Sequence, residues 1–222
     1  MHPIWADDPA EALALQARLR RRVVARGAPA PALVAGLDAA YSRDGATIYG
    51  AAVLFLFPGL EQVGEAWTEC EARFPYIPGL FAFREGPALC AALEALDRTP
   101  DLILVHGHGI AHPRRCGIAS HLGVLLGTPS IGVADLLLVG EAGEPRGERG
   151  AAAPVRFEGE VVGWAVRTRT GARPIYVSPG HLVGHAAAVE LVLAMTGNYR
   201  RPEPLRAAHR CAVSVRAGKT KR

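Results

Sequence analysis

Side chains that could do chemistry gather in one stretch, from Leu102 to Gly123, which reads LILVHGHGIAHPRRCGIASHLG. It holds four of the eight histidines and two adjacent arginines, directly after a short apolar run typical of a buried strand. Ligands of open α/β sheets bind beyond the carboxyl ends of strands. We therefore expect a site around His106, Gly107 and Gly109. A tight turn whose histidines bond to nearby carbonyls is the alternative, and this window alone favours neither.

A lone carboxylate, Asp38, interrupts the apolar stretch ALVAGLDAAY, which is predicted to be a strand. Burying an isolated charge is very costly, so this carboxylate must be paired, hydrogen-bonded or bound to a metal. Asp38 is therefore a second candidate for the site.

A third candidate lies in RFPYIPGLFAFREGP. Pro75 and Pro78 stiffen the backbone around Tyr76, and a rigid exposed ring is suited to stacking on a base or separating strands. A tyrosine packed beneath the loop is the alternative. Glu85 is expected to open the next helix, where the helix dipole favours a carboxylate.

The elements that must position these residues are predicted to form one domain over residues 1–222. Three strands in succession indicate an antiparallel meander, and the strand-helix alternation that follows indicates parallel crossovers. We expect a mixed α/β sheet flanked by helices. The predicted helices cover about 7–26, 85–97, 114–126 and 181–195; the strands 32–41, 48–57, 61–73, 102–105, 130–135, 155–159, 160–170 and 174–178; an exposed loop 140–153; and a disordered basic tail 216–222.

Composition restricts the class of protein further. Four widely separated cysteines form no CxxC pair, which argues against a zinc ribbon or a redox motif. The sequence has neither a membrane-spanning apolar run nor a secretory signal, so we expect a soluble cytoplasmic protein. The formal net charge of +4, with clustered arginines, suits a polyanionic partner, although a solvated surface explains it equally well.

Six strings occur in the order and at roughly the spacing of the endonuclease V family: AGLDAAY, PYIPGLFAFREGP, VHGHGIAHPRRCGIASHLGV, SIGVA, SPGHLVG and YRRPEPLRAAH. The chain resembles that family from about residue 6 to residue 210. The resemblance implies a ribonuclease H-like fold and a metal-dependent endonuclease of nucleic-acid repair. It also implies recognition of inosine in DNA or RNA and hydrolysis of a phosphodiester bond 3′ to the lesion. The expected cofactor is Mg²⁺, with Mn²⁺ as an alternative, and the expected state is a monomer.

The resemblance also implies roles for single residues. Asp38 and Glu85 match metal-binding carboxylates, and His181 matches a catalytic histidine near the scissile phosphate. The wedge that separates strands matches Tyr76 with Pro75, Ile77 and Pro78. The pocket for the flipped-out base matches Gly79, Leu80, Gly107 and Gly109. Candidates for phosphate contact are Arg114, Arg115 and His112, with a solvated helix end or structural hydrogen bonding as the alternative. For His121 we favour a structural role.

Two positions depart from the family pattern. His106 stands where a third metal-binding aspartate is expected, and Asp135 follows SIGVA where a lysine is expected. Three hypotheses follow. In the first, cleavage is lost and the chain is an inosine-binding homologue. In the second, His106 binds a softer ion such as Mn²⁺, and in the third, Asp135 supplies the missing carboxylate. A remote alternative is an unrelated hydrolase that binds zinc through His106 and His108.

Overall fold

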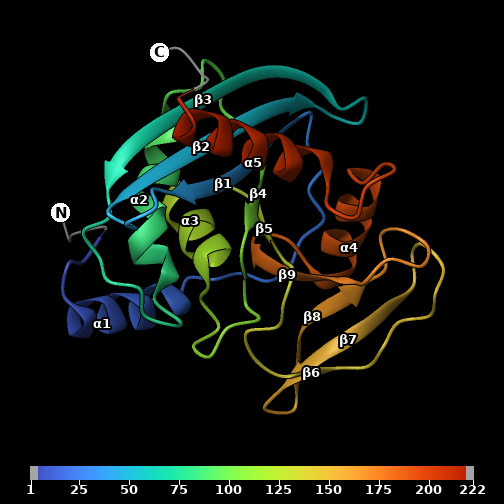
Figure 1. Cartoon of the computed structure of the whole chain (residues 1–222). Helices are drawn as coiled ribbons and strands as arrows, with labels where there is room; N and C mark the ends of the chain where they lie inside the picture. Colours follow the sequence, from blue (N-terminus) through green and yellow to red (C-terminus); the bar gives the residue numbers. More distant parts are fainter. Residues whose placement is uncertain (1–4, 219–222) are drawn as a thin grey trace.

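The computed structural model describes residues 5–218 of the chain, and Figure 1 shows the arrangement of their helices and strands. In this part of the chain the helices are α1 (Pro9–Arg20), α2 (Phe81–Glu94), α3 (Ile118–Leu126), α4 (His185–Ala194) and α5 (Glu203–Arg216). The strands are β1 (Leu33–Tyr41), β2 (Thr47–Leu56), β3 (Glu61–Glu71), β4 (Leu102–His106), β5 (Ser130–Ala134), β6 (Glu141–Ala142), β7 (Ala152–Phe157), β8 (Glu160–Val166) and β9 (Ile175–His181).

These strands form one mixed sheet in the order β3-β2-β1-β4-β5-β9-β8-β7-β6. Strands β1 to β3 are the predicted antiparallel meander, and β1, β4 and β5 run parallel. The predicted mixed α/β class is therefore confirmed. The register pairs Leu37 with Val105 and His106 with Val133. The residues that follow Leu37, Val105 and Val133 consequently lie together at the carboxyl end of the parallel strands.

Helices cover both faces of this sheet (Figure 1). Alternate strand residues point to opposite faces, and the core divides accordingly. Val34 and Val53 belong to clusters packed on the side of α4 and α5, whereas Ala35 and Leu54 pack on the side of α2 and α3. Helix α1 adds a further layer outside α3.

Close approach of α5 to β1 decides where the end of the chain meets the sheet. A Cβ atom on Gly36 would lie 2.1 Å from the carbonyl oxygen of Pro204, so only glycine allows this packing. From this contact, two residues along β1 advance about 7 Å to Asp38. Five residues along α5 advance about 7.5 Å to His209. The two side chains therefore arrive at the same level.

Several predicted boundaries are wrong. Helix α2 begins at Phe81, one turn before the predicted start, so Glu85 lies in its second turn rather than at its dipole end. Helix α3 begins only at Ile118, because residues 111–117 form turns. His181 ends a strand, and the helix expected from it begins at His185.

Helix α5 was not predicted, because its sequence PEPLRAAHRCAVSVR reads as a basic, proline-containing end. The prolines occupy its first turn, where a missing N–H costs no helical hydrogen bond. Arg216 is its last residue, so the predicted disordered tail cannot start there, and residues 219–222 lie outside the described part. Within residues 5–218, no helix is long and apolar enough to cross a membrane.

Candidate functional site

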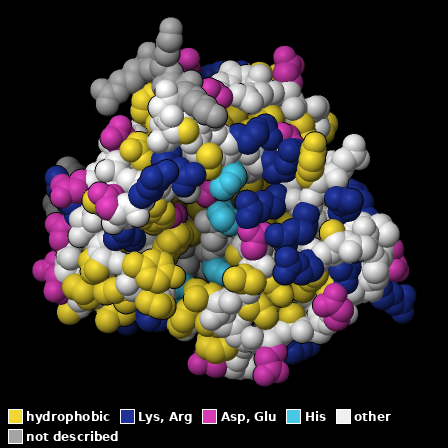
Figure 2. Space-filling view, viewed as in Figure 1, with side chains coloured by type: hydrophobic (Ala, Val, Ile, Leu, Met, Phe, Trp, Pro, Cys, Tyr) yellow, Lys and Arg dark blue, Asp and Glu magenta, His cyan; other side chains and the backbone are white. Residues whose placement is uncertain are grey.

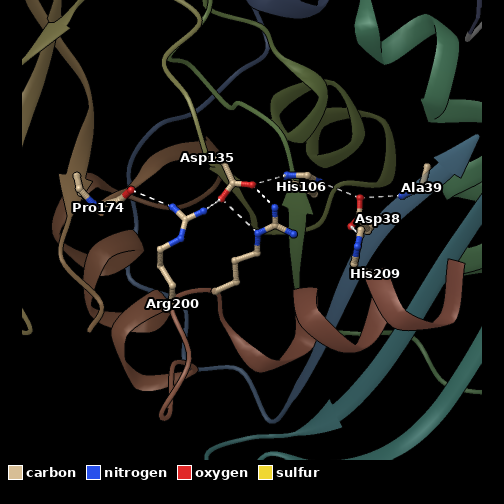
Figure 3. Close-up of polar contacts among 8 residues, drawn as sticks. Asp38, Ala39, His106, Asp135, Pro174, Arg200 and His209 are labelled. Atoms are coloured by element: carbon tan, nitrogen blue, oxygen red, sulfur yellow. Dashed lines mark hydrogen bonds and ion pairs between the residues drawn. The ribbon is translucent and has the colours of Figure 1, made fainter. Parts of the chain in front are cut away.

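Asp38 is the centre of a side-chain cluster at the point where the pairing of β1 with β4 ends (Figure 3). Its Oδ1 atom lies 2.9 Å from Nδ1 of His106, and its Oδ2 atom lies 2.9 Å from Nδ1 of His209 on α5. Oδ1 also accepts a hydrogen bond from the backbone N–H of Ala39 at 2.9 Å. Both oxygens of this buried carboxylate are thus engaged.

Asp135, directly after β5, extends the cluster on the other side of His106. Its Oδ2 atom lies 3.7 Å from Nε2 of His106, which is an ion-pair distance. Both oxygens of Asp135 accept hydrogen bonds from arginines, Arg200 and Arg201, in the segment before α5. Figure 3 shows this row of alternating acidic and basic side chains.

The pKa values in the cluster follow from these contacts. Burial opposes a charged carboxylate at Asp38, but the hydrogen bonds from His106 and His209 outweigh it and hold the pKa of Asp38 at about 2. Burial also opposes a charged imidazole, but the carboxylates of Asp135 and Asp38 raise the pKa of His106 to about 10. His106 and the neighbouring arginines keep the pKa of Asp135 below its usual range.

Glu85 behaves differently from the two aspartates. Burial raises its pKa to about 8, although a hydrogen bond from the hydroxyl of Tyr41, at 2.7 Å, opposes the shift. At neutral pH this carboxyl group therefore carries a proton. Two carboxylates and three cations remain in the cluster (Asp38, Asp135, His106, Arg200 and Arg201), so its charge favours an anion.

A cavity of about 550 Å³ adjoins the cluster and is lined by Asp38, Glu85, His106 and Asp135 together with apolar side chains. Its mouth carries Tyr76, which is 70% exposed and meets the ring of Phe81 edge-on at 6.5 Å. Figure 2 shows histidine side chains in this hollow, with apolar surface on one side and basic side chains on the other. The site is therefore a cavity with an aromatic entrance and a charged end.

Three side chains brace the loop that presents Tyr76. The carbonyl oxygen of Gly79 accepts hydrogen bonds from Gln16 (3.1 Å), His112 (2.9 Å) and Arg114 (2.7 Å). Gly79 has a φ of +81°, and a Cβ atom there would lie 2.8 Å from the Arg114 guanidinium. The loop is thus fixed by α1 and by the turn before α3.

The structure brings part of the predicted base pocket together. Gly79 and Gly107 line the cavity, as do Tyr76, Ile77 and Pro78 of the predicted wedge, while the adjacent Pro75 is exposed. Leu80 instead packs in the core with Phe74 and Phe83, and Gly109 packs against β9, its N–H bonding to Ser178. Leu80 and Gly109 therefore do not line the cavity.

The three residues predicted to contact phosphate all make contacts within the protein. Arg115 is buried, pairs with Glu158 and Glu160 at 3.2 Å each, and lies 4.6 Å from the centre of the Phe157 ring. His112 is buried with both ring nitrogens hydrogen-bonded, to Gly79 and to the backbone N–H of Arg114. Arg114 donates from Nε to Gln16 and from Nη2 to Gly79, which leaves its Nη1 without an acceptor among the described residues. His112 and Arg114 therefore support the Tyr76 loop, whereas Arg115 holds the turn between β7 and β8.

His181 is also placed away from the cluster. Strand β9 runs antiparallel to β5, so its last residue pairs with Ser130 at the start of β5, whereas Asp135 follows the end of β5. The Nδ1 atom of His181 accepts a hydrogen bond from the N–H of Val24 at 3.2 Å. The histidine of α5 that contacts Asp38 is His209.

The residues present do not fit the implied divalent cation. In the chain from residue 5 to residue 218, no three histidine, cysteine or acidic side chains converge as metal ligands. Imidazoles engage both oxygens of Asp38, Glu85 accepts a hydrogen bond from Tyr41, and arginines hold Asp135. The predicted set Asp38, Glu85 and His106 is thus not a metal centre in this arrangement, and neither is the histidine cluster proposed for zinc.

The cluster and the braced loop include residues whose roles sequence reasoning does not predict. His209, Arg200 and Arg201 all lie in YRRPEPLRAAH, a string that supports the family resemblance, and Gln16 lies in α1. The length of that string was a signal that its polar residues share a site. Only the packing of α5 over β1 shows which site it is.

The cluster can transfer protons. Asp38 is ionised and can only accept hydrogen bonds, so Nδ1 of His209 donates to it and Nε2 is left as the basic atom. An aspartate that orients a half-exposed histidine in this way is an arrangement for general acid-base catalysis.

The sheet order, with polar side chains at the carboxyl ends of β1, β4 and β5 beside a cavity, defines a ribonuclease H-like nuclease. The sequence pattern of the Endonuclease V family matches residues 17–210. This chain belongs to the Endonuclease V family, and the prediction of an endonuclease is confirmed.

Similar proteins cover nearly the whole chain. Endonuclease V of Roseiflexus sp. (strain RS-1) is 49% identical over 205 residues, which are 92% of this chain and 91% of that protein. The crystal structure of Endonuclease V from Streptomyces avermitilis is 42% identical, with a TM-score of 0.91, and covers 97% of this chain and 96% of that one. Ciona intestinalis Endonuclease V, bound to a DNA that contains an inosine followed by a ribo-adenosine, is 26% identical, with a TM-score of 0.80, and covers 95% of this chain and 98% of that one.

Proposed function

We propose that this chain recognises inosine in DNA or RNA and hydrolyses a phosphodiester bond 3′ to it, as a monomeric cytoplasmic enzyme of nucleic-acid repair. One observation carries the proposal: the cavity entered past Tyr76 is lined by Asp38, and Nδ1 of His209 lies 2.9 Å from Oδ2 of this carboxylate. A base held in this cavity leaves its flanking phosphate beside a proton-transferring histidine.

Base recognition follows from the shape of the entrance. Extruding a base from a stack costs a few kcal/mol. A ring at the position of Tyr76 offsets part of that cost by stacking, and the bracing of Gly79 keeps it in place. The cavity wall at Gly79 and Gly107 is backbone, which can approach a flat base closely.

Phosphate hydrolysis needs a proton acceptor for water and cations for the phosphate. Nε2 of His209 is the acceptor, oriented through Nδ1 by Asp38. The surplus positive charge of the cluster attracts the phosphate. The expected cation, Mg²⁺ or Mn²⁺, lacks free carboxylate ligands in this arrangement, so the proposed proton transfer rests on His209 alone.

A second function is inosine binding without cleavage. It is favoured by the donor set, since His106 and the arginines hold both aspartates that a cation would need. The two functions share the cavity and differ only in the chemistry at its charged end.

Cleavage assays separate the two functions. Oligonucleotides of DNA and of RNA, each with inosine or adenine at one position, are incubated with Mg²⁺ or Mn²⁺. The wild-type protein is compared with His106→Asp and with the double variant His106→Asp, Asp135→Lys. We expect the wild-type protein to cut the inosine strand 3′ to the lesion and to leave the adenine strand intact.

Inosine-selective binding with cleavage only in the double variant would establish the second function. Equal affinity of the wild-type protein for inosine and adenine strands would contradict both functions. Sedimentation of the protein with and without the oligonucleotide tests the monomer.

A further inference from the structure

Asp135 holds two arginines at the charged end of the cavity, and it holds them differently. Arg200 donates from Nη2 to Oδ1 of Asp135 and from Nη1 to the carbonyl oxygen of Pro174 at 3.1 Å. Both ends of its guanidinium are therefore anchored to the protein, as Figure 3 shows. Arg200 therefore links Asp135 to Pro174, the residue directly before β9.

Arg201 donates hydrogen bonds to Asp135 from one edge of its guanidinium only. Nε donates to Oδ1 at 3.2 Å, and Nη2 donates to Oδ2. Among the described residues, Nη1 of Arg201 donates to no acceptor. The side chain is 30% exposed.

Asp135 and His106 connect Arg201 to the pair formed by Asp38 and His209. Oδ2 of Asp135 contacts both Nη2 of Arg201 and, at 3.7 Å, Nε2 of His106, and His106 in turn contacts Asp38. Asp135 and His106 both line the cavity. Arg201, Asp135, His106, Asp38 and His209 thus form one connected row of contacts, and three of its members line the cavity.

We propose that Asp135 is a positioning residue that presents the free edge of Arg201 to a nucleic-acid phosphate at the Asp38–His209 pair. The proposal rests on the proposed function for the identity of the ligand. A guanidinium binds phosphate through parallel N–H groups, and fixing its orientation beforehand reduces the entropy lost on binding. The two arginines outweigh the charge of Asp135, so the carboxylate does not repel the phosphate.

Substitution of Asp135 distinguishes positioning from plain electrostatics by the sign of the effect. Asp135→Asn removes a negative charge next to the phosphate path. If the carboxylate only repelled phosphate, affinity for an inosine-containing oligonucleotide would rise. If it positions Arg201, affinity falls, and we expect a loss of about three- to ten-fold.

Arg201→Gln tests the contact itself. Loss of one phosphate contact lowers the slope of log affinity against log salt by about one. The control Arg98→Gln removes the same charge from an exposed residue before β4, at the end of that strand opposite His106. Arg98→Gln is expected to leave the slope unchanged.

A scan with neutral phosphates identifies the partner without relying on the folding of a variant. Methylphosphonate replaces one phosphate at a time around the inosine, and binding to the wild-type protein and to Arg201→Gln is measured. One position should weaken wild-type binding and have no effect on Arg201→Gln. Thermal unfolding checks that each variant is folded.

The proposal is overturned if Asp135→Asn binds more tightly, or if every neutral phosphate affects the wild-type protein and Arg201→Gln equally. These outcomes leave the proposed function intact, because wild-type selectivity for inosine over adenine is read separately. Absence of that selectivity, with the Arg201 contact present, would overturn the proposed function alone.

Discussion

Nδ1 of His209 lies 2.9 Å from Oδ2 of Asp38, although 171 positions separate the two residues in the chain. Helix α5 brings them together because Gly36 lets it approach β1 at Pro204. The side chain of His209 is about half-exposed, whereas that of Asp38 is buried.

His209→Gln should lower the rate of cleavage by 10²- to 10⁴-fold, the usual contribution of a general acid or base. Binding of the inosine oligonucleotide should change by less than about three-fold, because the cavity is intact. His181→Gln is the matched comparison, and it should leave the rate within about three-fold if the protein stays folded. A larger loss in His181→Gln than in His209→Gln would reverse the assignment.

Tyr76→Ala should weaken binding of the inosine strand by about 1–3 kcal/mol, the value of one stacked base. The unfolding free energy should change by less than about 0.5 kcal/mol, because the side chain is 70% exposed. Tyr76→Phe keeps the ring and should bind like the wild-type protein. Equal losses for the two variants would show that the hydroxyl, not the ring, is used.

Gln16→Leu should destabilise the loop that carries Tyr76. Gln16 is fully buried and donates to the carbonyl oxygens of Gly79 (3.1 Å) and Cys116 (2.7 Å), so leucine leaves two buried acceptors without this donor. We expect a loss of about 1–3 kcal/mol in unfolding free energy. Weaker inosine binding should accompany this loss of stability. Gln16→Glu should not restore the stability, because a carboxylate cannot donate. Chemical denaturation and oligonucleotide titration measure the two effects.

His112 should make the stability of the fold depend on pH. Burial, and then the charge of Arg114, lower the pKa of His112 to about 4. Between about pH 6.5 and pH 4 the unfolded chain binds a proton that the folded chain does not. The contribution is present above pH 6.5 and is lost as pH falls toward 4, by up to about 3 kcal/mol.

Denaturation of the wild-type protein and of His112→Gln across this pH range measures the contribution of His112 to the unfolding free energy. Glutamine can still donate to Gly79 but does not titrate, so the difference in unfolding free energy between the two proteins should shrink as pH falls. A difference that stays constant between pH 7 and pH 4.5 would contradict the low pKa.

The sequence by itself determined the sheet core and the identity of the family. Apolar runs fix β1, β2, β4 and β5 because a buried strand needs apolar residues on both faces, and Asp38 stands out because a lone charge there requires a partner. The long strings around Tyr76 and His112 identify the family. They do not say which of their polar side chains face the cavity.

Only the tertiary structure decided which polar residues act together. The antiparallel direction of β9 takes His181 to the far end of β5, while the unpredicted α5 delivers His209 to Asp38. The late start of α3 turns Arg115 inward to Glu158 and Glu160. The sequence determines the chemistry of each side chain. Strand direction and helix position depend on long-range packing, and they determine whether a histidine or an arginine reaches the site.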